Sequence, residues 1–128
     1  MKKLGRIIYN GVKLEPHEKA TVRFLADRGY NIDVVHPQNI PKSKNADVLI
    51  DGVVWEIKCP ETRSDKGLER IFQDAARQSD SLLINLKYIK FSEERALVKS
   101  RKIFQAYRRF RRMKIITKNG DFIDFYKR

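Results

Sequence analysis

Apolar residues recur along the chain with two different periods, and these periods divide it into helices and strands. Spacings of three and four residues predict amphipathic helices at these places: residues 16–28, about 68–79, and 92–112. Alternating or continuous apolar runs predict strands at residues 6–9, 31–35, 47–50, 53–58, 82–86, 114–117 and 122–125. This order of elements predicts an α/β fold, with a mixed β-sheet flanked by helices.

Turn and capping residues mark several of these boundaries. Pro16 suits the first turn of a helix, and Gly29 ends that helix. Ser92 can cap the third helix. Asp51-Gly52 and Asn119-Gly120 predict tight turns, each within a β-hairpin.

The composition fits one globular domain over residues 1–128. The chain is 41% hydrophobic and 34% charged, and it contains no internal repeat or linker. No apolar run is long enough to cross a membrane, and the run near the N-terminus is too short for a signal peptide. A single cysteine excludes a disulfide framework and a cysteine cluster for zinc.

The net charge of +12 lies mainly in the second half of the chain. Residues 65–128 contain 17 basic and 8 acidic residues, which gives 17 − 8 = +9. This excess favours a polyanionic partner, nucleic acid first, with an acidic membrane surface or an acidic protein as alternatives. We expect phosphate contacts from the basic third helix through Lys99, Arg101, Lys102, Arg108, Arg109 and Arg112. The alternative is a solvated basic face.

The segment "ADVLIDGVVWEIKCP", residues 46–60, places charged residues in an apolar hairpin. Asp47 and Glu56 are nine residues apart across a tight turn, so they can face each other on adjacent strands. Two carboxylates then form an oxygen-rich site for Mg²⁺ or Mn²⁺. Lys58, on the same face as Glu56, would hold a phosphate oxygen or the attacking water. Phosphodiester hydrolysis needs such a metal and such a cation.

Glu18 lies on the apolar stripe of the first predicted helix, four residues before Val22. A carboxylate on a core-facing side is costly unless it is paired, so we expect Glu18 to complete the metal shell. The alternative is that Glu18 caps the helix or reaches solvent. Likewise, Asp47 could support the turn, and Glu56 with Lys58 could be a solvated edge-strand pair that contributes little.

Asp47, the segment Glu56-Ile57-Lys58, and Glu18 together resemble the PD-(D/E)xK nuclease signature. The acidic pair and lysine read as D-x8-E-I-K, with Ala46 where the usual proline stands. The resemblance implies a restriction-endonuclease-like core. It also implies that Glu18, Asp47, Glu56 and Lys58 are catalytic, with the three acids holding the metal.

Three longer stretches narrow the resemblance: "PHEKATVRFLADRGYNIDVVHP", "NADVLIDGVVWEIKCP" and "ARQSDSLLINL". Over residues 16–86 the chain looks like the C-terminal tRNase domain of contact-dependent growth inhibition toxins. This implies the toxin module of a larger protein, which cleaves tRNA in the cytoplasm of a target cell. It implies a divalent metal (Mg²⁺, Mn²⁺ or Zn²⁺) and a cognate immunity protein. His17, Thr62 and Gln78 are further active-site candidates.

Two other functions are compatible with the same residues. The first is a DNA endonuclease of the same superfamily, such as a restriction or resolvase-like enzyme. The second is a non-catalytic nucleic-acid-binding module that keeps the fold. The sequence leaves the oligomeric state open.

Overall fold

The structure of the chain is a computed structural model that describes residues 3–35 and 47–127, with Asp47 described through its backbone alone. The chain divides into two compact units, residues 1–57 and 58–128. The single domain expected from the sequence stays a prediction, and the polar loop expected near residues 36–44 lies outside the described residues. None of the helices in the described part is long and apolar enough to span a membrane.

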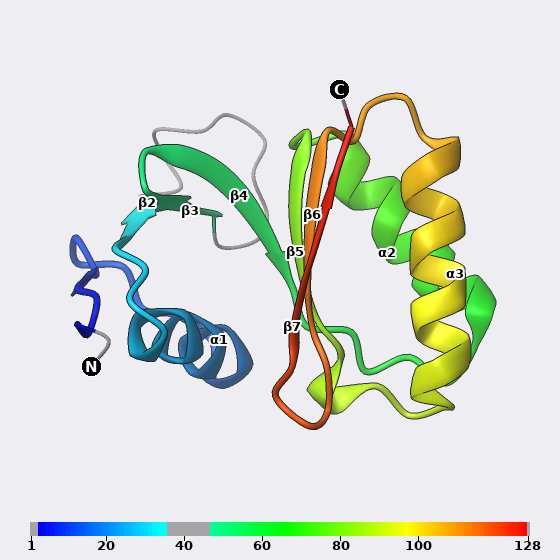
Figure 1. Cartoon of the computed structure of the whole chain (residues 1–128), viewed down its shortest axis with the longest axis horizontal. Coiled ribbons are helices and arrows are strands. Elements are labelled where there is room, and N and C mark those ends of the chain that lie inside the picture. The colour runs from blue at the N-terminus through cyan, green and yellow to red at the C-terminus, as the bar shows by residue number, and fades with distance from the viewer. Residues whose placement is uncertain (1–2, 36–46, 128) are drawn as a thin grey trace. The chain divides into compact units, whose positions relative to one another are not determined.

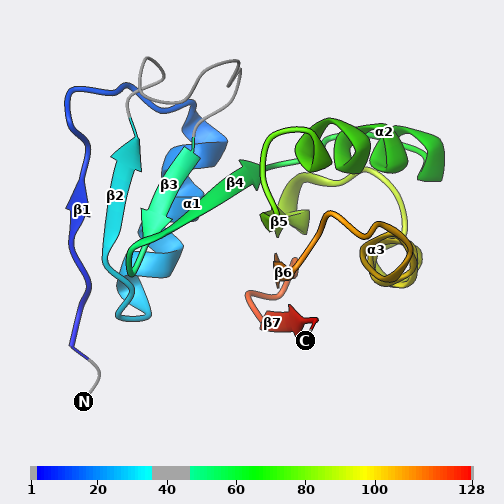
Figure 2. The ribbon, with the colours of Figure 1, turned by 90° about the horizontal axis from the view of Figure 1, so that it is seen from above.

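The first unit is a βαβ crossover followed by a hairpin (Figure 2). Its elements are β1 (Ile7–Ile8), α1 (Pro16–Asp27), β2 (Ile32–Val35), β3 (Asp47–Ile50) and β4 (Val53–Lys58), whose last residue begins the second unit. β1 and β2 are parallel, with α1 as the crossover between them, and β2, β3 and β4 pair antiparallel in that order. The predicted inner stripe of α1, Val22, Leu25 and Ala26, is buried.

Left-handed backbone closes the β3–β4 hairpin. Asp51 and Gly52 have φ values of 50° and 86°, the conformation of a two-residue turn whose twist matches the flanking strands. Because the turn holds only these two residues, Ile50 pairs with Val53, and each further pair follows outward from the turn. The turn therefore sets which residues of β3 and β4 face each other.

The second unit contains two α-helices that cover one face of three strands (Figure 1). Its elements are α2 (Asp65–Ala76), β5 (Ser81–Asn85), the short 3₁₀ helix η2 (Leu86–Tyr88), α3 (Glu93–Ala106), β6 (Arg112–Ile116) and β7 (Phe122–Tyr126). β5 and β6 are parallel, with α3 as the crossover between them, and β7 pairs antiparallel with β6. Ser92 caps α3 as predicted, because its hydroxyl accepts the N–H of Arg95 at 3.3 Å.

Aromatic rings fill the core of the second unit. The ring of Phe72 on α2 meets that of Phe110 edge-on, with centroids 6.0 Å apart. Phe110 also stacks with Phe104 and Tyr107, in the geometries that aromatic pairs prefer. All five residues of β5 are buried, as its continuous apolar run predicted. The described strands mix parallel and antiparallel pairing and carry three flanking α-helices, so the predicted fold class is confirmed.

The predicted end of the second helix is wrong. α2 ends at Ala76, before the expected boundary near Ser79-Asp80. The hydroxyl of Ser79 accepts the N–H of Ser81 at 3.0 Å and donates to the carbonyl of Ser81 at 3.1 Å. These bonds hold a local turn that leads directly into β5. Ser79 is buried, as its place on the apolar stripe predicted, although it lies outside the helix.

The predicted end of the third helix, Arg112, is also wrong. α3 ends at Ala106, and Tyr107 is already extended, with ψ of 112°. The N–H groups of Arg111 and Arg112 both donate to the carbonyl of Asp80, at 2.8 and 3.2 Å, which starts β6 beside β5. The apolar spacing continued past the helix because the residues that follow it pack into the same core.

Replacement of Gly52 by alanine tests the turn. Gly52 has φ of 86°, and no atom lies within 4 Å of a Cβ added there, so the substitution strains the backbone alone. We expect Gly52→Ala to lower the free energy of unfolding by about 1–2 kcal/mol, measured by urea denaturation. Asp51→Asn is the control and should change little, because asparagine tolerates the left-handed conformation. Equal stability of Gly52→Ala and the wild type would contradict this account of the turn.

Candidate active site

Asp47 lies directly opposite Glu56 in the β3–β4 ladder. Residues directly opposite each other in an antiparallel pair belong to the same face of the sheet, a few ångströms apart. The spacing of nine residues across the Asp51-Gly52 turn therefore produces the juxtaposition expected from the sequence. Asp47 stands at the first position of β3, at the end of the hairpin away from the turn.

Glu56 and Lys58 lie two residues apart on β4 and so share one face of that strand. The Glu56 side chain is fully buried, with 0% exposed, and Lys58 is half-buried. A solvated edge-strand pair, the alternative raised by the sequence, does not fit a buried Glu56. Burial of an ionised carboxylate is costly unless a cation or hydrogen bonds compensate it, so a bound cation would suit this position.

Glu18 lies in the first turn of α1. This helix begins at the end of the unit where β2 ends and β3 begins (Figure 2), and Val35 at the end of β2 pairs with Asp47. The Glu18 carboxylate also accepts the N–H of Glu15 at 2.9 Å and so caps the helix. The capping role is therefore confirmed. Glu18 performs it at the end of the sheet where Asp47 begins β3.

His17 lies in the same turn of α1 and is half-buried. Its carbonyl accepts the hydroxyl of Thr21 at 2.8 Å. This bond ties Thr21 to the start of the helix and assigns nothing to the imidazole. A direct role for His17 stays a prediction.

Oxygen is the donor type that the three predicted metal ligands offer. Among the residues whose side chains are described, no three acidic, histidine or cysteine side chains form a group that could hold a metal ion. The side chain of Asp47 lies outside that set. The metal site of Glu18, Asp47 and Glu56 therefore stays a prediction, supported by the register and by the burial of Glu56.

Thr62 and Gln78 lie close to the two ends of α2. The Thr62 hydroxyl accepts the N–H of Ser64, and a Cβ on Gly67 would lie 1.8 Å from that oxygen. Thr62 thus packs closely against the start of α2. Gln78 was expected on the second helix but lies in the turn after it, where its N–H donates to the carbonyl of Ala75. Neither position assigns these residues to the site.

The six predicted phosphate contacts fall on three different elements. Lys99, Arg101 and Lys102 are on α3, Arg108 and Arg109 are in the turn after it, and Arg112 is on β6. The Arg112 guanidinium donates to the hydroxyl of Ser81 at 3.0 Å and lies 3.9 Å from the carboxylate of Asp80. The expectation that all six line one basic helix is therefore wrong.

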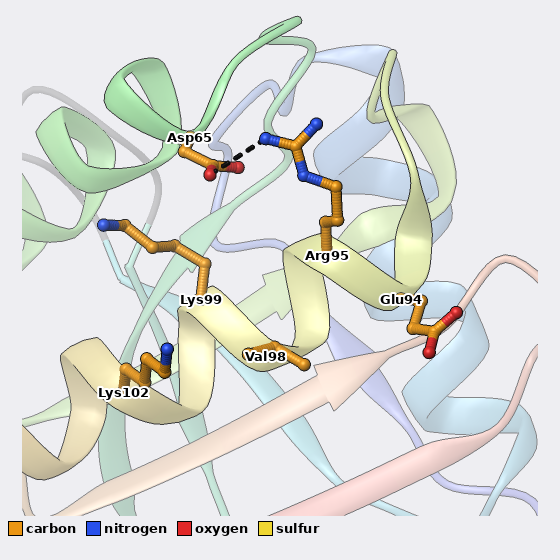
Figure 3. A pocket seen from close by; sticks show the side chains of 6 residues that line it. All are labelled: Asp65, Glu94, Arg95, Val98, Lys99 and Lys102. Carbon is orange, nitrogen blue, oxygen red and sulfur yellow. Dashed lines mark hydrogen bonds and ion pairs between the residues drawn. The ribbon is translucent and has the colours of Figure 1, made fainter.

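A groove of about 370 Å³ lies between α2 and α3, lined by Asp65, Glu94, Arg95, Val98, Lys99 and Lys102 (Figure 3). Arg95 pairs with Asp65 at 3.1 Å, and Lys99 pairs with Glu69 at 3.5 Å. These pairs offset much of the positive charge that the sequence places on α3. The groove is therefore a weaker polyanion site than the count of basic residues suggests.

The structure resembles that of a known toxin. It matches a chain of the "CdiA-CT/CdiI toxin and immunity complex from Burkholderia pseudomallei" with a TM-score of 0.70 and 16% identity, over 96% of this chain and 100% of that chain. At this identity the likeness concerns the fold alone. No curated protein sequence matches the chain significantly.

Residues 44–122 match the family described as the contact-dependent growth inhibition CdiA C-terminal domain. This match spans more than half of the chain and includes the β3–β4 hairpin and nearly all of the second unit. The chain belongs to this family. It is a toxin domain of contact-dependent growth inhibition.

Two substitutions of Glu18 distinguish its role as a helix cap from the effect of its negative charge. We expect Glu18→Ala to lower the free energy of unfolding by about 0.5–1 kcal/mol, because the N–H of Glu15 loses its acceptor. Glu18→Gln should stay close to the wild type, since a glutamine carbonyl can accept the same bond. Arg23→Ala, at an exposed position of the same helix, is the control. Urea denaturation measures all three, and a large loss in Glu18→Gln would show that the cap is not the main structural role.

Proposed function

We propose that this toxin domain is a metal-dependent endonuclease of the PD-(D/E)xK type that cleaves tRNA. The observation that carries the proposal is the register that sets Asp47 opposite Glu56, with Lys58 on the same face of β4. Family membership supports a toxin activity. The net charge of +12 supports a polyanionic substrate.

The acidic residues fit a hard divalent cation. Like charges directly opposite each other on antiparallel strands repel, and Glu56 is also fully buried. A bound Mg²⁺ or Mn²⁺ would offset both costs, and carboxylate oxygens are the ligands that these ions prefer. Zn²⁺ is a weaker candidate because no cysteine or histidine belongs to the acidic pair. Asp47 and Glu56 would hold the ion, and Glu18 would support it directly or through water.

The chain's own residues would supply the remaining parts of the hydrolysis. When bound, the metal polarises a phosphoryl oxygen and lowers the pKa of water. The Lys58 ammonium would donate to a phosphate oxygen or hold the attacking water. It would also stabilise the negative charge that develops on the phosphorus oxygens. The burial around Glu56 strengthens these electrostatic interactions because it excludes water.

We also propose a cognate immunity protein as the partner of this domain. The solved structure that it resembles is a toxin and immunity complex, and a cell that makes a nuclease toxin must block it. The toxin would act in the cytoplasm of a target cell, where tRNA is found. The net charge of +12 would suit an acidic inhibitor.

A cleavage assay tests the nuclease. The purified domain is incubated with total tRNA or with duplex DNA, each with Mg²⁺, Mn²⁺, Zn²⁺ or EDTA. We expect tRNA cleavage that needs the metal and stops in EDTA. Asp47→Asn and Glu56→Gln should fall to background because they remove ligands without changing size. Lys58→Met should lose roughly a hundredfold or more in rate.

Matched controls separate these effects from misfolding. Asp51→Asn removes a carboxylate from the turn of the same hairpin, and Lys66→Met removes an exposed lysine; both should cleave like the wild type. Glu18→Gln, which keeps the cap, reports whether the third carboxylate contributes. Cleavage of DNA alone would favour the DNA endonuclease instead. Binding without cleavage of either substrate would favour the non-catalytic module.

A further inference from the structure

A group of basic residues lies at one end of the second unit, where the turn after α3 comes close to the end of β7 (Figure 1). We call this surface the basic end; it comprises Arg108, Arg109, Arg111, Arg112 and Lys127. Arg108, Arg109 and Arg111 are exposed, and none of the three pairs with an acid of the described chain. Unlike Arg95 and Lys99 in the α2–α3 groove, which are ion-paired, these arginines keep their full charge for a partner.

Hydrogen bonds to the backbone hold the basic end together. The carbonyl of Asp80 accepts the N–H groups of Arg111 and Arg112, and the N–H of Lys127 donates to the carbonyl of Arg111 at 3.0 Å. The Lys127 ammonium donates to the carbonyl of Tyr107 at 2.7 Å. Partial burial lowers the pKa of Lys127, and the neighbouring Arg111 cation lowers it further. These hydrogen bonds to the backbone therefore hold several cations close together.

Tyr126 stands within this cationic surface. It pairs directly with Arg112 across the β6–β7 ladder, and 67% of its side chain is exposed. The nearest acid on the same face of β7, Asp124, is ion-paired with the buried Lys114 at 2.5 Å. Asp124 is therefore already engaged by Lys114, and the other acid near Tyr126 is Asp80, 3.9 Å from the guanidinium of Arg112. An aromatic ring this exposed contributes little burial energy to the fold.

We infer that Tyr126 is a stacking platform for an unpaired nucleobase, and that the arginines of the basic end hold the phosphates on either side of that base. This inference rests on the proposed nuclease function and narrows its substrate to a single-stranded segment of nucleic acid. Aromatic faces stack on bases only where the bases are unpaired or splayed out. Arginine and lysine hold the backbone of a single strand without reading its sequence.

A duplex explains the same surface less well. Phosphate contacts to a duplex need the cations alone, because paired bases present only their edges. The exposed ring of Tyr126 would then have no base face to stack on. An apolar protein surface could also cover a tyrosine, but Arg108, Arg109 and Arg111, which make no ion pair with an acid of the described chain, favour an anionic ligand. The loops and the end of a folded RNA supply unpaired bases next to phosphates.

Fluorescence anisotropy tests the inference without cleavage. The probes are a labelled single-stranded RNA of about twelve nucleotides, close to the site sizes of single-strand binders, and the same strand annealed to its complement. EDTA is present throughout, so that binding is measured alone. The wild type is compared with Tyr126→Ala, Tyr126→Phe and Arg109→Ala, each shown to be folded by circular dichroism.

We expect Tyr126→Ala to weaken single-strand binding by roughly five- to a hundredfold, the range for one stacked base, with duplex binding unchanged. Tyr126→Phe should bind like the wild type because the ring remains. Arg109→Ala should weaken both probes similarly and reduce the salt dependence by about one phosphate contact. Unchanged single-strand binding by Tyr126→Ala, or an equal loss on the duplex, would overturn the inference.

The two proposals fail in distinguishable ways. Single-strand binding that depends on Tyr126, in a domain that cleaves nothing, would support the platform and refute the nuclease. Metal-dependent cleavage without any effect of Tyr126→Ala on binding would refute the platform alone. A domain that binds neither RNA probe would refute the platform, and a domain that also cleaves no tRNA with any of the metals would refute both.

Discussion

The register of the β3–β4 hairpin is the constraint on which the account of the active site depends. Asp51 and Gly52 close the hairpin in the left-handed conformation, and counting outward from them sets Asp47 opposite Glu56. A slip of one residue would move Asp47 to the other face of the sheet. Val48 and Ile50, which are buried on that other face, hold the register through the hydrophobic effect. A two-residue turn and an apolar core thus bring two like charges together.

The basic residues are distributed unevenly along the chain, whereas the acidic residues are not. The acidic pair would hold a cation in the first unit, and the excess of basic residues lies in residues 65–128. Part of that excess is offset within the second unit, where acids of α2 pair with Arg95 and Lys99. Arg108, Arg109 and Arg111 follow α3, where β6 begins beside β5, and none of them pairs with an acid of the described chain. These three arginines keep their charge for a polyanionic partner.

The elements that are set locally could be predicted from the sequence. The helix from Pro16 and the hairpin at Asp51-Gly52 depend on spacing, caps and turn residues, and they were correctly predicted. The ends of α2 and α3 could not be predicted, because they depend on bonds that residues near Ser79 and Asp80 make to the chain around them.

In the candidate site, too, local features could be predicted from the sequence and long-range contacts could not. The acidic pair could be predicted because its partners are nine residues apart in a hairpin, whereas Gln78 was expected on a helix that ends two residues before it. Arg111 and Tyr126 were overlooked. The backbone of Arg111 bonds to Asp80 and to Lys127, both more than a dozen residues away, and the apolar alternation of the last strand stops before Tyr126. Residue spacing carries no information about such long-range contacts.

Direct metal binding tests the central claim, that Asp47 and Glu56 together hold a divalent cation. Isothermal titration of Mn²⁺ into the metal-free domain should show a single site that is lost in Glu56→Gln and retained in Asp51→Asn, with both variants folded. This measurement needs no nucleic-acid substrate and does not depend on cleavage. Mn²⁺ binding of equal affinity in Glu56→Gln, or no binding by the wild type, would contradict the account.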